Sequence, residues 1–394
     1  MGSFPGPGKH PPSCTGSGTT LPRPLPSLSN HARCAATPYR RLPRRSRRTL
    51  LRMAETAPAL TPLTRRLRRQ TKRARRYFVA CSVRAMIALC GLLPFAITRR
   101  LFPPLLGFFA HRMLRADIYR HLDLAYDHSL AAAEKKRIAR RVAHNLGLLV
   151  AEVLALLRNR LPAGYIDDTE FKALDLKGGF LGLSAHIGNW EVLAWQARKQ
   201  WPNVDTAVVA HRHANRHINR LIERMRRAFG VSTIYQEASP RRTIRMLTQG
   251  KIVAVAPDQD VAHIAGMFVP FFGKPAWTPT GPAFLACMAK APLLLCFTRR
   301  TANGLRLVCP APLYPNPDAP REEEIKRLTK AWSDAVEQHI REQPSDWMWF
   351  HKRWQTTPER LERRRVRRKC SQEKVDTLRP LAQPAENQPT ENRA

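Results

Sequence analysis

The chain has 394 residues, 43% of them hydrophobic, which is enough for one large or two small domains with a buried core. Its 67 Lys and Arg residues against 30 Asp and Glu give a formal net charge of +37. This excess favours polyanionic partners, namely nucleic acid, anionic lipid or a very acidic protein. None of the 8 cysteines lies in a C-x-x-C pair, which argues against a zinc site and for thiols in a reducing compartment.

The N-terminal fifth of the chain is basic and poor in apolar residues. From Met1 to Arg76 the only acidic residue is Glu55, while arginines cluster in "RRLPRRSRR" and "RRLRRQTKRARR". Residues 1–52 are rich in Pro, Ser, Gly and Arg and cannot bury enough apolar surface to become ordered. We predict that residues 1–76 form a disordered basic extension. Met53 is a possible true start, which the intact mass of the native protein would test.

An apolar stretch follows in residues 77–110. It begins with "YFVACSVRAMIALCGLLPFAIT" and continues through two arginines into "LFPPLLGFFA". A spanning helix needs roughly 20 apolar residues, and this stretch is barely long enough and contains Arg84 and Pro94. It could span the bilayer, dip into one leaflet with its arginines at the headgroups, or form a buried helical hairpin. Because cationic residues flank it on both sides, we expect a membrane-anchoring helix.

Residues 111–354 show the pattern of an α/β domain. Ala133–Leu157 has helical periodicity, and a last helix is expected from about Arg321 to Glu342. Short apolar runs alternate with further helical stretches, which predicts a central mixed sheet flanked by helices. The predicted strands lie in "GGFLGLSA", "DTAVVAHR", "VSTIY", "GKIVAVAPD", "APLLLCFTRR" and "GLRLVCP". Residues 355–394 are charged and rich in Pro, Gln and Asn, as in a disordered tail.

The stretch "LSAHIGNWEVLAW" places His186 and Glu191 five residues apart between a predicted strand and a predicted helix. On one continuous helix they would point about 140° apart. If His186 lies on the turn and Glu191 in the first helical turn, the side chains can converge. An imidazole paired with a carboxylate is suited to general-base chemistry on a substrate hydroxyl. The alternative is structural, with a turn histidine, Asn189 as a helix cap and Glu191 favoured by the helix dipole.

Five ordered blocks make the sequence resemble the bacterial lipid A biosynthesis lauroyl and myristoyl acyltransferases, which belong to the lysophospholipid acyltransferase superfamily and share a His-x4-Asp/Glu signature. The resemblance covers roughly Ala80 to Trp354. Its blocks are "SAHIGNWE", "VVAHRHANRHINRLIERMRRAFG", "GKIVAVAPDQD", "GMFVPFFGKPAWTPTGPAFLA" and "QPSDWMWFHKRW". The polar "VAHRHA", which contains Arg212, departs from the family's usual tyrosine-arginine-proline.

The resemblance implies a single glycerolipid-acyltransferase-like domain and roles for several residues. His186 and Glu191 would be catalytic. Arg212 would support an oxyanion or hold a phosphate, unless it is one surface arginine among many. The remaining candidates for substrate binding or the oxyanion are Asn189, Arg227, Asp258 and Asp260. For the two aspartates the alternative is a paired-carboxylate metal site. We favour a structural role in which they bind backbone amides and arginines and shape the pocket wall.

Two aromatic blocks of this domain have two interpretations each. "FVPFFG" offers Phe268, Phe271 and Phe272 as core or as the lining of an acyl pocket. Trp347, Trp349 and Trp354 could form an interfacial belt against headgroups or packing that seals the sheet.

The resemblance also implies the reaction partners. Acyl carrier protein would donate the acyl chain, and a phosphorylated glycolipid, a lipid A precursor, would accept it, with no cofactor or metal and with no nucleic acid partner. The protein would lie at the surface of the bacterial inner membrane, its catalytic domain facing the cytoplasm. The basic charge fits acidic substrates. The alternatives are a relative acting on another glycolipid or phospholipid, a basic nucleic-acid-binding protein, and a membrane scaffold without activity.

Overall fold

The computed structural model describes residues 91–176, 179–212, 215–237 and 240–364, together with part of the segment 70–90. Residues 1–69, including the possible start at Met53, and residues 365–394 of the predicted tail lie outside the described residues.

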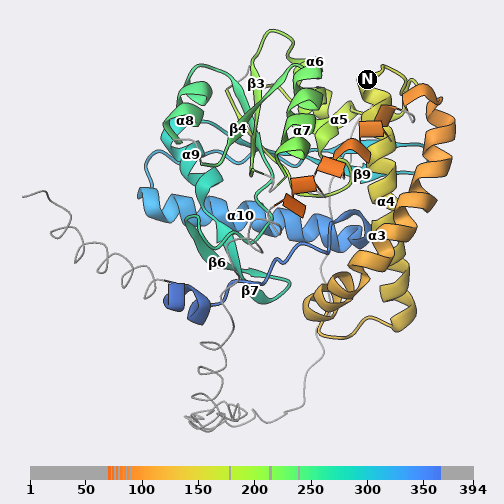
Figure 1. The fold of residues 1–394 in the computed structure, drawn as a ribbon. Helices are drawn as coiled ribbons and strands as arrows, with labels where there is room; N and C mark the ends of the chain where they lie inside the picture. Colours follow the sequence, from red (N-terminus) through yellow and green to blue (C-terminus); the bar gives the residue numbers. More distant parts are fainter. Residues whose placement is uncertain are drawn as a thin grey trace, which may run out of the picture. The chain divides into compact units, whose positions relative to one another are not determined.

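Two long helices, α3 (Phe95–Ala125) and α4 (Ala132–Leu157), pack side by side as a helical hairpin (Figure 1). They approach closely where Gly147 of α4 meets Pro103 of α3, since a Cβ atom at residue 147 would lie 2.5 Å from the Pro103 Cα. Helix α3 runs without a break through residue 110, so the boundary predicted between 110 and 111 is not one of secondary structure.

No helix among the described residues is long and apolar enough to cross a membrane, so the expected membrane-anchoring helix is unsupported. Part of α3 is instead packed inward, as in the hairpin alternative, with Phe95, Phe102 and Pro103 buried. Other apolar side chains of α3 face outward, among them Leu105, Phe108 and Met113.

A five-stranded sheet forms the centre of the fold, in the order β4-β3-β5-β2-β8, and all its neighbouring strands are parallel. The predicted α/β class is confirmed, but the central sheet is parallel rather than mixed. Its strands are β2 (Leu181–Leu183), β3 (Thr206–Ala210), β4 (Val231–Tyr235), β5 (Ile252–Val255) and β8 (Leu293–Leu295). Successive residues of β8 enter different hydrophobic clusters, because strands of a parallel sheet are buried on both faces.

Antiparallel pairing occurs outside this sheet. Strand β9 (Phe297–Arg300) pairs with β10 (Leu305–Val308), which also pairs in parallel with the two-residue β1 (Ile166–Asp167). Strands β6 (Gly266–Phe271) and β7 (Lys274–Pro279) form a separate hairpin.

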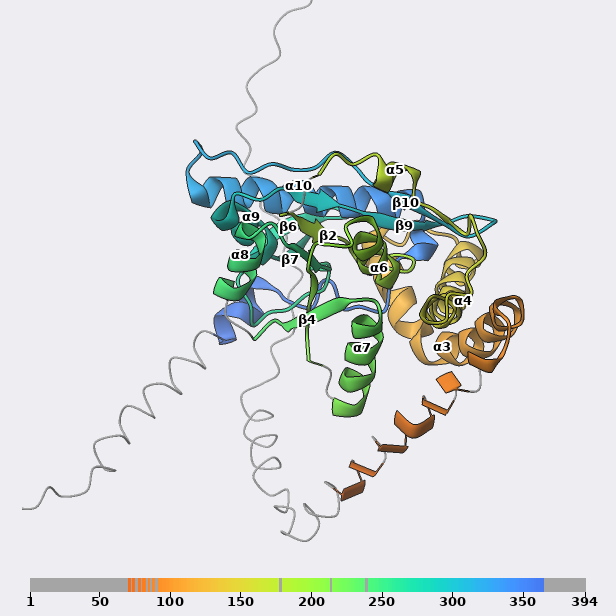
Figure 2. The same cartoon turned by 90° about the horizontal axis from the view of Figure 1, so that it is seen from above.

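Helices connect and cover these strands, as the alternating pattern predicts (Figure 2). Helix α10 (Arg321–Glu342) has the predicted bounds and packs against α9 (Gly281–Ala289) and the β6–β7 hairpin. The others are α5 (Thr169–Lys172), α6 (Glu191–Gln200), α7 (Arg216–Ala228), α8 (Pro240–Thr248) and the 3₁₀ turn η1 (Pro344–Asp346).

The aromatic residues of the predicted "FVPFFG" and tryptophan blocks form packing. Phe271, Phe272, Trp347 and Trp349 are all buried in the largest hydrophobic cluster, and Trp354 packs against it. For Trp347 and Trp349 this excludes the interfacial belt, since neither side chain reaches the surface of the described chain.

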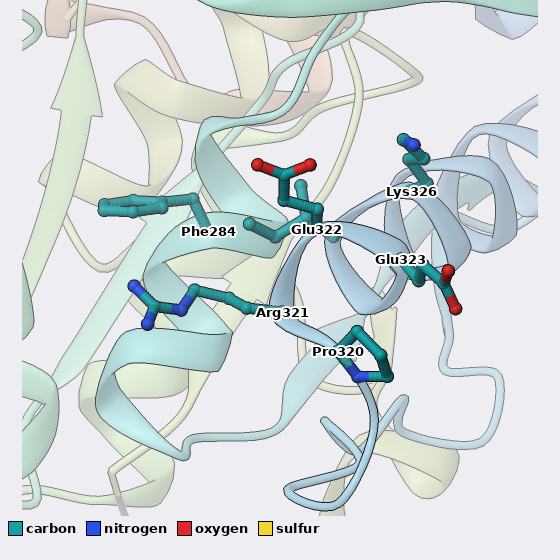
Figure 3. Close-up of a pocket in the computed structure, with 7 residues that line it drawn as sticks. Phe284, Pro320, Arg321, Glu322, Glu323 and Lys326 are labelled. Carbon is teal, nitrogen blue, oxygen red and sulfur yellow. The ribbon is translucent and has the colours of Figure 1, made fainter.

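A surface pocket of about 660 Å³ lies between α9 and the beginning of α10 (Figure 3). One aromatic ring, two aliphatic side chains and four charged side chains line it. These residues are Phe284, Pro320, Arg321, Glu322, Glu323, Ile325 and Lys326. It contains none of the predicted site residues.

Candidate active site

The carboxyl ends of two neighbouring parallel strands bring His186 and Asp258 together. Strand β2 pairs with β5 so that Leu183 lies beside Val255, and the two functional residues each follow three positions later. Ligand sites in parallel α/β sheets gather at this edge. The His186 Nδ1 atom lies 2.7 Å from Asp258 Oδ1. The histidine therefore has a carboxylate partner that is 72 residues away in the sequence.

Asp258 is held by two further hydrogen bonds and is almost completely buried. Its Oδ2 atom accepts from the His186 backbone N–H at 2.9 Å and from the Trp347 indole N–H at 2.9 Å. This side chain thus binds the ring of His186 and its backbone at the same time. Such double contact fixes the orientation of the imidazole as well as its tautomer.

The electrostatic surroundings of His186 favour its charged form. Burial lowers the pKa of His186, but the charge of Asp258, its hydrogen bond and the charge of Glu191 outweigh burial and raise it above the usual 6.5. Burial alone would raise the pKa of Asp258. The charge of His186 and its hydrogen bond outweigh burial and bring the pKa of the carboxyl well below its usual range. Asp258 therefore stays ionised while His186 can gain and lose a proton.

The other ring nitrogen of His186 faces polar and aromatic neighbours. Its Nε2 atom lies 3.1 Å from the Gln259 amide nitrogen, and the Trp190 ring meets the imidazole edge-on at 4.8 Å between centroids. The His351 ring is also 4.8 Å away. Burial, together with the charge of His186, lowers the pKa of His351 to about 4, so His351 is neutral near pH 7.

Glu191 is the first residue of α6, and His186 lies on the turn before it, as predicted. The predicted contact between them is not the one that forms. Both Glu191 carboxylate oxygens bind Arg226 of α7, at 2.7 Å from its Nη2 and 3.1 Å from its Nε. Because His186 lies on the turn, outside the helix, its Nδ1 contacts Asp258 at the end of strand β5. Glu191 does not bind the imidazole but raises its pKa through its charge.

The arginines proposed for substrate binding lie at the surface. Arg212 follows β3 and is 61% exposed, with its guanidinium 3.8 Å from the centre of the Tyr235 ring. Arg227 is exposed, whereas its neighbour Arg226 is buried. The helical phase of α7 thus turns Arg226, and not Arg227, toward Glu191.

The two remaining candidates have structural contacts. Asn189 is 0% exposed, and its side-chain amide donates to Glu152. Asp260 accepts a hydrogen bond of 2.6 Å from the backbone N–H of Thr356. Asp258 and Asp260 thus each accept a hydrogen bond from a backbone amide, and no arginine hydrogen-bonds to either carboxylate among the described residues.

No group of three or more His, Cys, Asp or Glu side chains is arranged to hold a metal ion in the described part of the chain. The chemistry that the arrangement itself offers is proton transfer at His186 Nε2.

Sequence reasoning missed Gln259, His351, Trp347 and Arg226 as neighbours of the site. Gln259 stands between the two aspartates of a quoted block, and Trp347 and His351 belong to the terminal aromatic block. Their position within these sequence blocks is the feature that could have identified them. The pairing of strands that brings these blocks together cannot be read from the blocks themselves.

A comparison of the sequence with protein families identifies relatives of the chain. The family described as bacterial lipid A biosynthesis acyltransferase matches residues 67–356 of the chain. The chain belongs to this family. The match includes the helices α3 and α4 as well as the sheet. Membership of this family makes the chain an acyltransferase.

Two curated relatives are similar over shorter regions. A lipid A biosynthesis lauroyltransferase of Escherichia coli is 35% identical over 122 residues, which are 29% of this chain and 38% of the relative. A phosphatidylinositol mannoside acyltransferase of Mycobacterium tuberculosis is 24% identical over 176 residues, 43% of this chain and 52% of the relative. The aligned regions thus span between about two fifths and half of these relatives.

The contact between Glu191 and Arg226 yields a prediction about stability. Arg226→Met leaves the largely buried Glu191 carboxylate without its partner and should lower the free energy of unfolding by about 3 kcal/mol, the scale for breaking a buried pair. The matched control is Arg227→Met on the exposed face, which should change it by less than about 0.5 kcal/mol. Urea unfolding of both variants measures the difference, and equal losses would contradict the assignment.

Proposed function

We propose that this protein transfers a fatty acyl chain from acyl carrier protein to a hydroxyl group of a lipid A precursor, with His186 as the general base. The contact of 2.7 Å between His186 Nδ1 and Asp258 is the observation that carries this proposal. Family membership supports the reaction class, and the name of the lauroyltransferase relative supports the acceptor.

In the proposed mechanism Nε2 of neutral His186 takes the proton of the acceptor hydroxyl while Asp258 stabilises the imidazolium. The alkoxide oxygen attacks the thioester carbonyl and forms a tetrahedral intermediate. Its collapse forms the ester bond and breaks the carbon–sulfur bond. The leaving thiolate takes the proton back from Nε2, so His186 ends the cycle neutral.

The surface of α7 fits an acidic protein donor. Four arginines are exposed along one side of this helix at intervals of four, four and three residues, and no ion pair joins them to another described residue. They are Arg216, Arg220, Arg224 and Arg227. Unpaired charges of one sign along a helix attract a partner of the opposite sign and raise its rate of association. Because Arg226 of the same helix binds Glu191, this stripe is joined directly to the active-site helix.

A second acceptor class is supported by the mannoside acyltransferase relative. A glycolipid other than a lipid A precursor offers the same hydroxyl chemistry to His186. The two candidates differ in the phosphates and sugars that the protein must recognise, and an assay with both acceptors separates them.

We further propose that α3 rests in the interface of the bacterial inner membrane, with the catalytic domain on the cytoplasmic side. The outward side chains of α3 include Leu105, Phe108 and Met113, the last two 66% and 81% exposed. Arg112 and Arg115 are exposed on the same helix. Exposed apolar side chains can bury area at the boundary of headgroups and acyl chains, and exposed arginines are attracted to anionic lipid.

The first test is transfer of a labelled acyl chain from acyl carrier protein to a tetra-acylated, phosphorylated lipid A precursor. His186→Ala should reduce transfer by roughly a hundredfold or more, since it removes the general base. Asp258→Asn keeps the size of the side chain and should also reduce transfer. Tyr314→Ser, which changes an exposed side chain outside both the arginine stripe and the site, serves as a folded control.

The same assay tests the donor. Added salt should lower kcat/KM for acyl carrier protein but not for a small acyl thioester, because salt screens attraction between the charged surfaces. Full activity of folded His186→Ala would refute the general base, and equal salt dependence of the two donors would refute the arginine stripe.

The pH dependence of transfer follows from the raised pKa of His186. The base must be neutral, so kcat/KM should rise with pH and reach half of its maximum above pH 6.5. In Asp258→Asn the favourable charge is lost and burial remains, which should move this midpoint below that of the wild type. A midpoint unaffected by Asp258→Asn would contradict the pairing of the two residues.

If α3 contacts the membrane, substitution of its exposed apolar residues should weaken vesicle binding. The triple variant Leu105→Ser, Phe108→Ser, Met113→Ser should bind vesicles of anionic phospholipid at least tenfold more weakly in a flotation assay, since it removes apolar area from the proposed contact. The matched control is Met288→Ser, Tyr314→Ser, which removes exposed apolar side chains elsewhere. Equal binding of both variants would argue against α3 as the contact.

A further inference from the structure

The four residues between His186 and Glu191 have close contacts with other elements of the described chain. Ile187 forms a backbone bridge with Trp347, and the Gly188 N–H donates to the carbonyl oxygen of Asp346 at 2.8 Å. Gly188 has a φ of +57°, and a Cβ atom there would lie 2.4 Å from Thr298 Oγ1. Glycine is required at this position both by its backbone angle and by the closeness of β9.

Thr298 of β9 binds the turn on both sides of Gly188. Its hydroxyl accepts from the Asn189 backbone N–H at 2.7 Å and donates to the Ile187 carbonyl oxygen at 2.9 Å. Thr298 is 0% exposed. Its single hydroxyl therefore provides a hydrogen-bond partner inside the protein for two backbone groups, the Asn189 N–H and the Ile187 carbonyl. Unsatisfied backbone groups are costly in the interior, and the turn is therefore held where the hydroxyl is.

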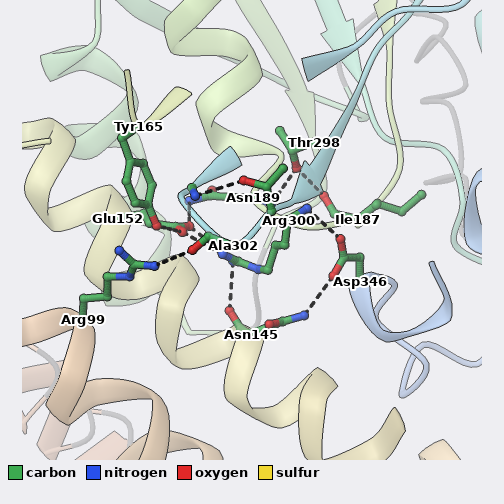
Figure 4. Close-up of polar contacts among 12 residues, drawn as sticks. Arg99, Asn145, Glu152, Tyr165, Ile187, Asn189, Thr298, Arg300, Ala302 and Asp346 are labelled. Atoms are coloured by element: carbon green, nitrogen blue, oxygen red, sulfur yellow. Dashed lines mark hydrogen bonds and ion pairs between the residues drawn. The ribbon is translucent and has the colours of Figure 1, made fainter. Parts of the chain in front are cut away.

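Asn189 ties the same turn to helix α4. Its amide nitrogen donates to Glu152 at 2.9 Å, and Glu152 binds Arg300 at 2.7 Å and accepts from the Tyr165 hydroxyl at 2.8 Å (Figure 4). The Arg300 backbone N–H in turn donates to Asp346, whose carbonyl oxygen receives the Gly188 N–H. This network joins α4, β9, η1 and the turn, and all of its charged members are buried.

We propose that Thr298 and Asn189 are positioning residues, which fix the turn so that His186 Nε2 meets the acceptor hydroxyl. This inference rests on the proposed function of His186. It differs from the role in substrate or oxyanion binding expected for Asn189, because a side chain that is 0% exposed and bound to Glu152 presents no donor at the surface where a substrate binds. A displacement of the base of about 1 Å is enough to cost roughly a hundredfold in rate.

The test is a set of threonine variants in the acyl-transfer assay. Thr298→Val keeps the shape of the side chain but removes the hydroxyl, and we expect kcat to fall roughly ten- to a hundredfold with KM changed less than about threefold. Thr298→Ser keeps the hydroxyl and should recover most of kcat. The matched control is Thr329→Val in α10, another threonine with 0% exposure, whose hydroxyl has no hydrogen-bond partner among the described residues.

Asn189→Ala gives a second, independent readout. Positioning predicts a lower kcat, and an effect in Thr298→Val, Asn189→Ala that is smaller than the product of the single effects, because both residues hold one turn. A raised KM with unchanged kcat would instead indicate contact with substrate and overturn the assignment of Asn189.

Hydrogen exchange of the backbone amides in residues 183–195 needs no substrate and keeps this inference separate from the proposed function. Exchange at the turn should be faster in Thr298→Val, and unchanged in Thr298→Ser and Thr329→Val. If the wild type transfers no acyl chain, the proposed function fails while faster exchange in Thr298→Val still supports the held turn. The positioning role would be overturned if Thr298→Val had the exchange rates and the kcat of the wild type. It would also be overturned if Thr298→Val and Thr329→Val lost kcat equally.

Discussion

The contact between His186 and Asp258 depends on the pairing of β2 with β5 in a parallel sheet. Two residues that follow paired positions by the same number of residues leave the sheet at the same edge, and there the carboxylate can bind both the ring and the backbone of the histidine. The surrounding structure maintains this arrangement. Trp347 binds the second carboxylate oxygen, and Gln259 lies beside His186 Nε2. A shift of one strand against the other would separate base and carboxylate together with these neighbours.

The sequence predicts elements well where a local pattern determines them. The bounds of α10, the position of His186 on a turn and the beginning of α6 near Glu191 follow from prolines, periodicity and a change from strand to helix. The partner of His186 could not be predicted in this way. Glu191 is near in sequence, but Asp258 is near in space, and only the strand order β4-β3-β5-β2-β8 shows which strand end lies beside which. The order of strands depends on long-range packing that no local window contains.

The same limit explains the remaining differences. Adjacent arginines in α7 point in different directions, and the choice of Arg226 as the inward residue depends on where α6 places Glu191. The apolar stretch before residue 111 has enough hydrophobic residues for several arrangements. In the structure α3 packs one side on α4, where Gly147 allows close approach, and leaves other apolar residues outside. Composition reports how much apolar surface a segment has but not which part a neighbouring helix covers.

The turn between histidine and glutamate bears on how such motifs are written. In the His-x4-Glu notation the intervening residues are treated as free. Here the positive φ of Gly188 and its contact with Thr298 exclude any side chain, Asn189 is bound within the protein, and Trp190 lies against the imidazole. A search that fixes only the two outer letters would accept many chains that cannot fold this loop. A pattern that also requires the glycine and asparagine, with a hydroxyl residue on a later strand, would describe an architecture rather than a spacing.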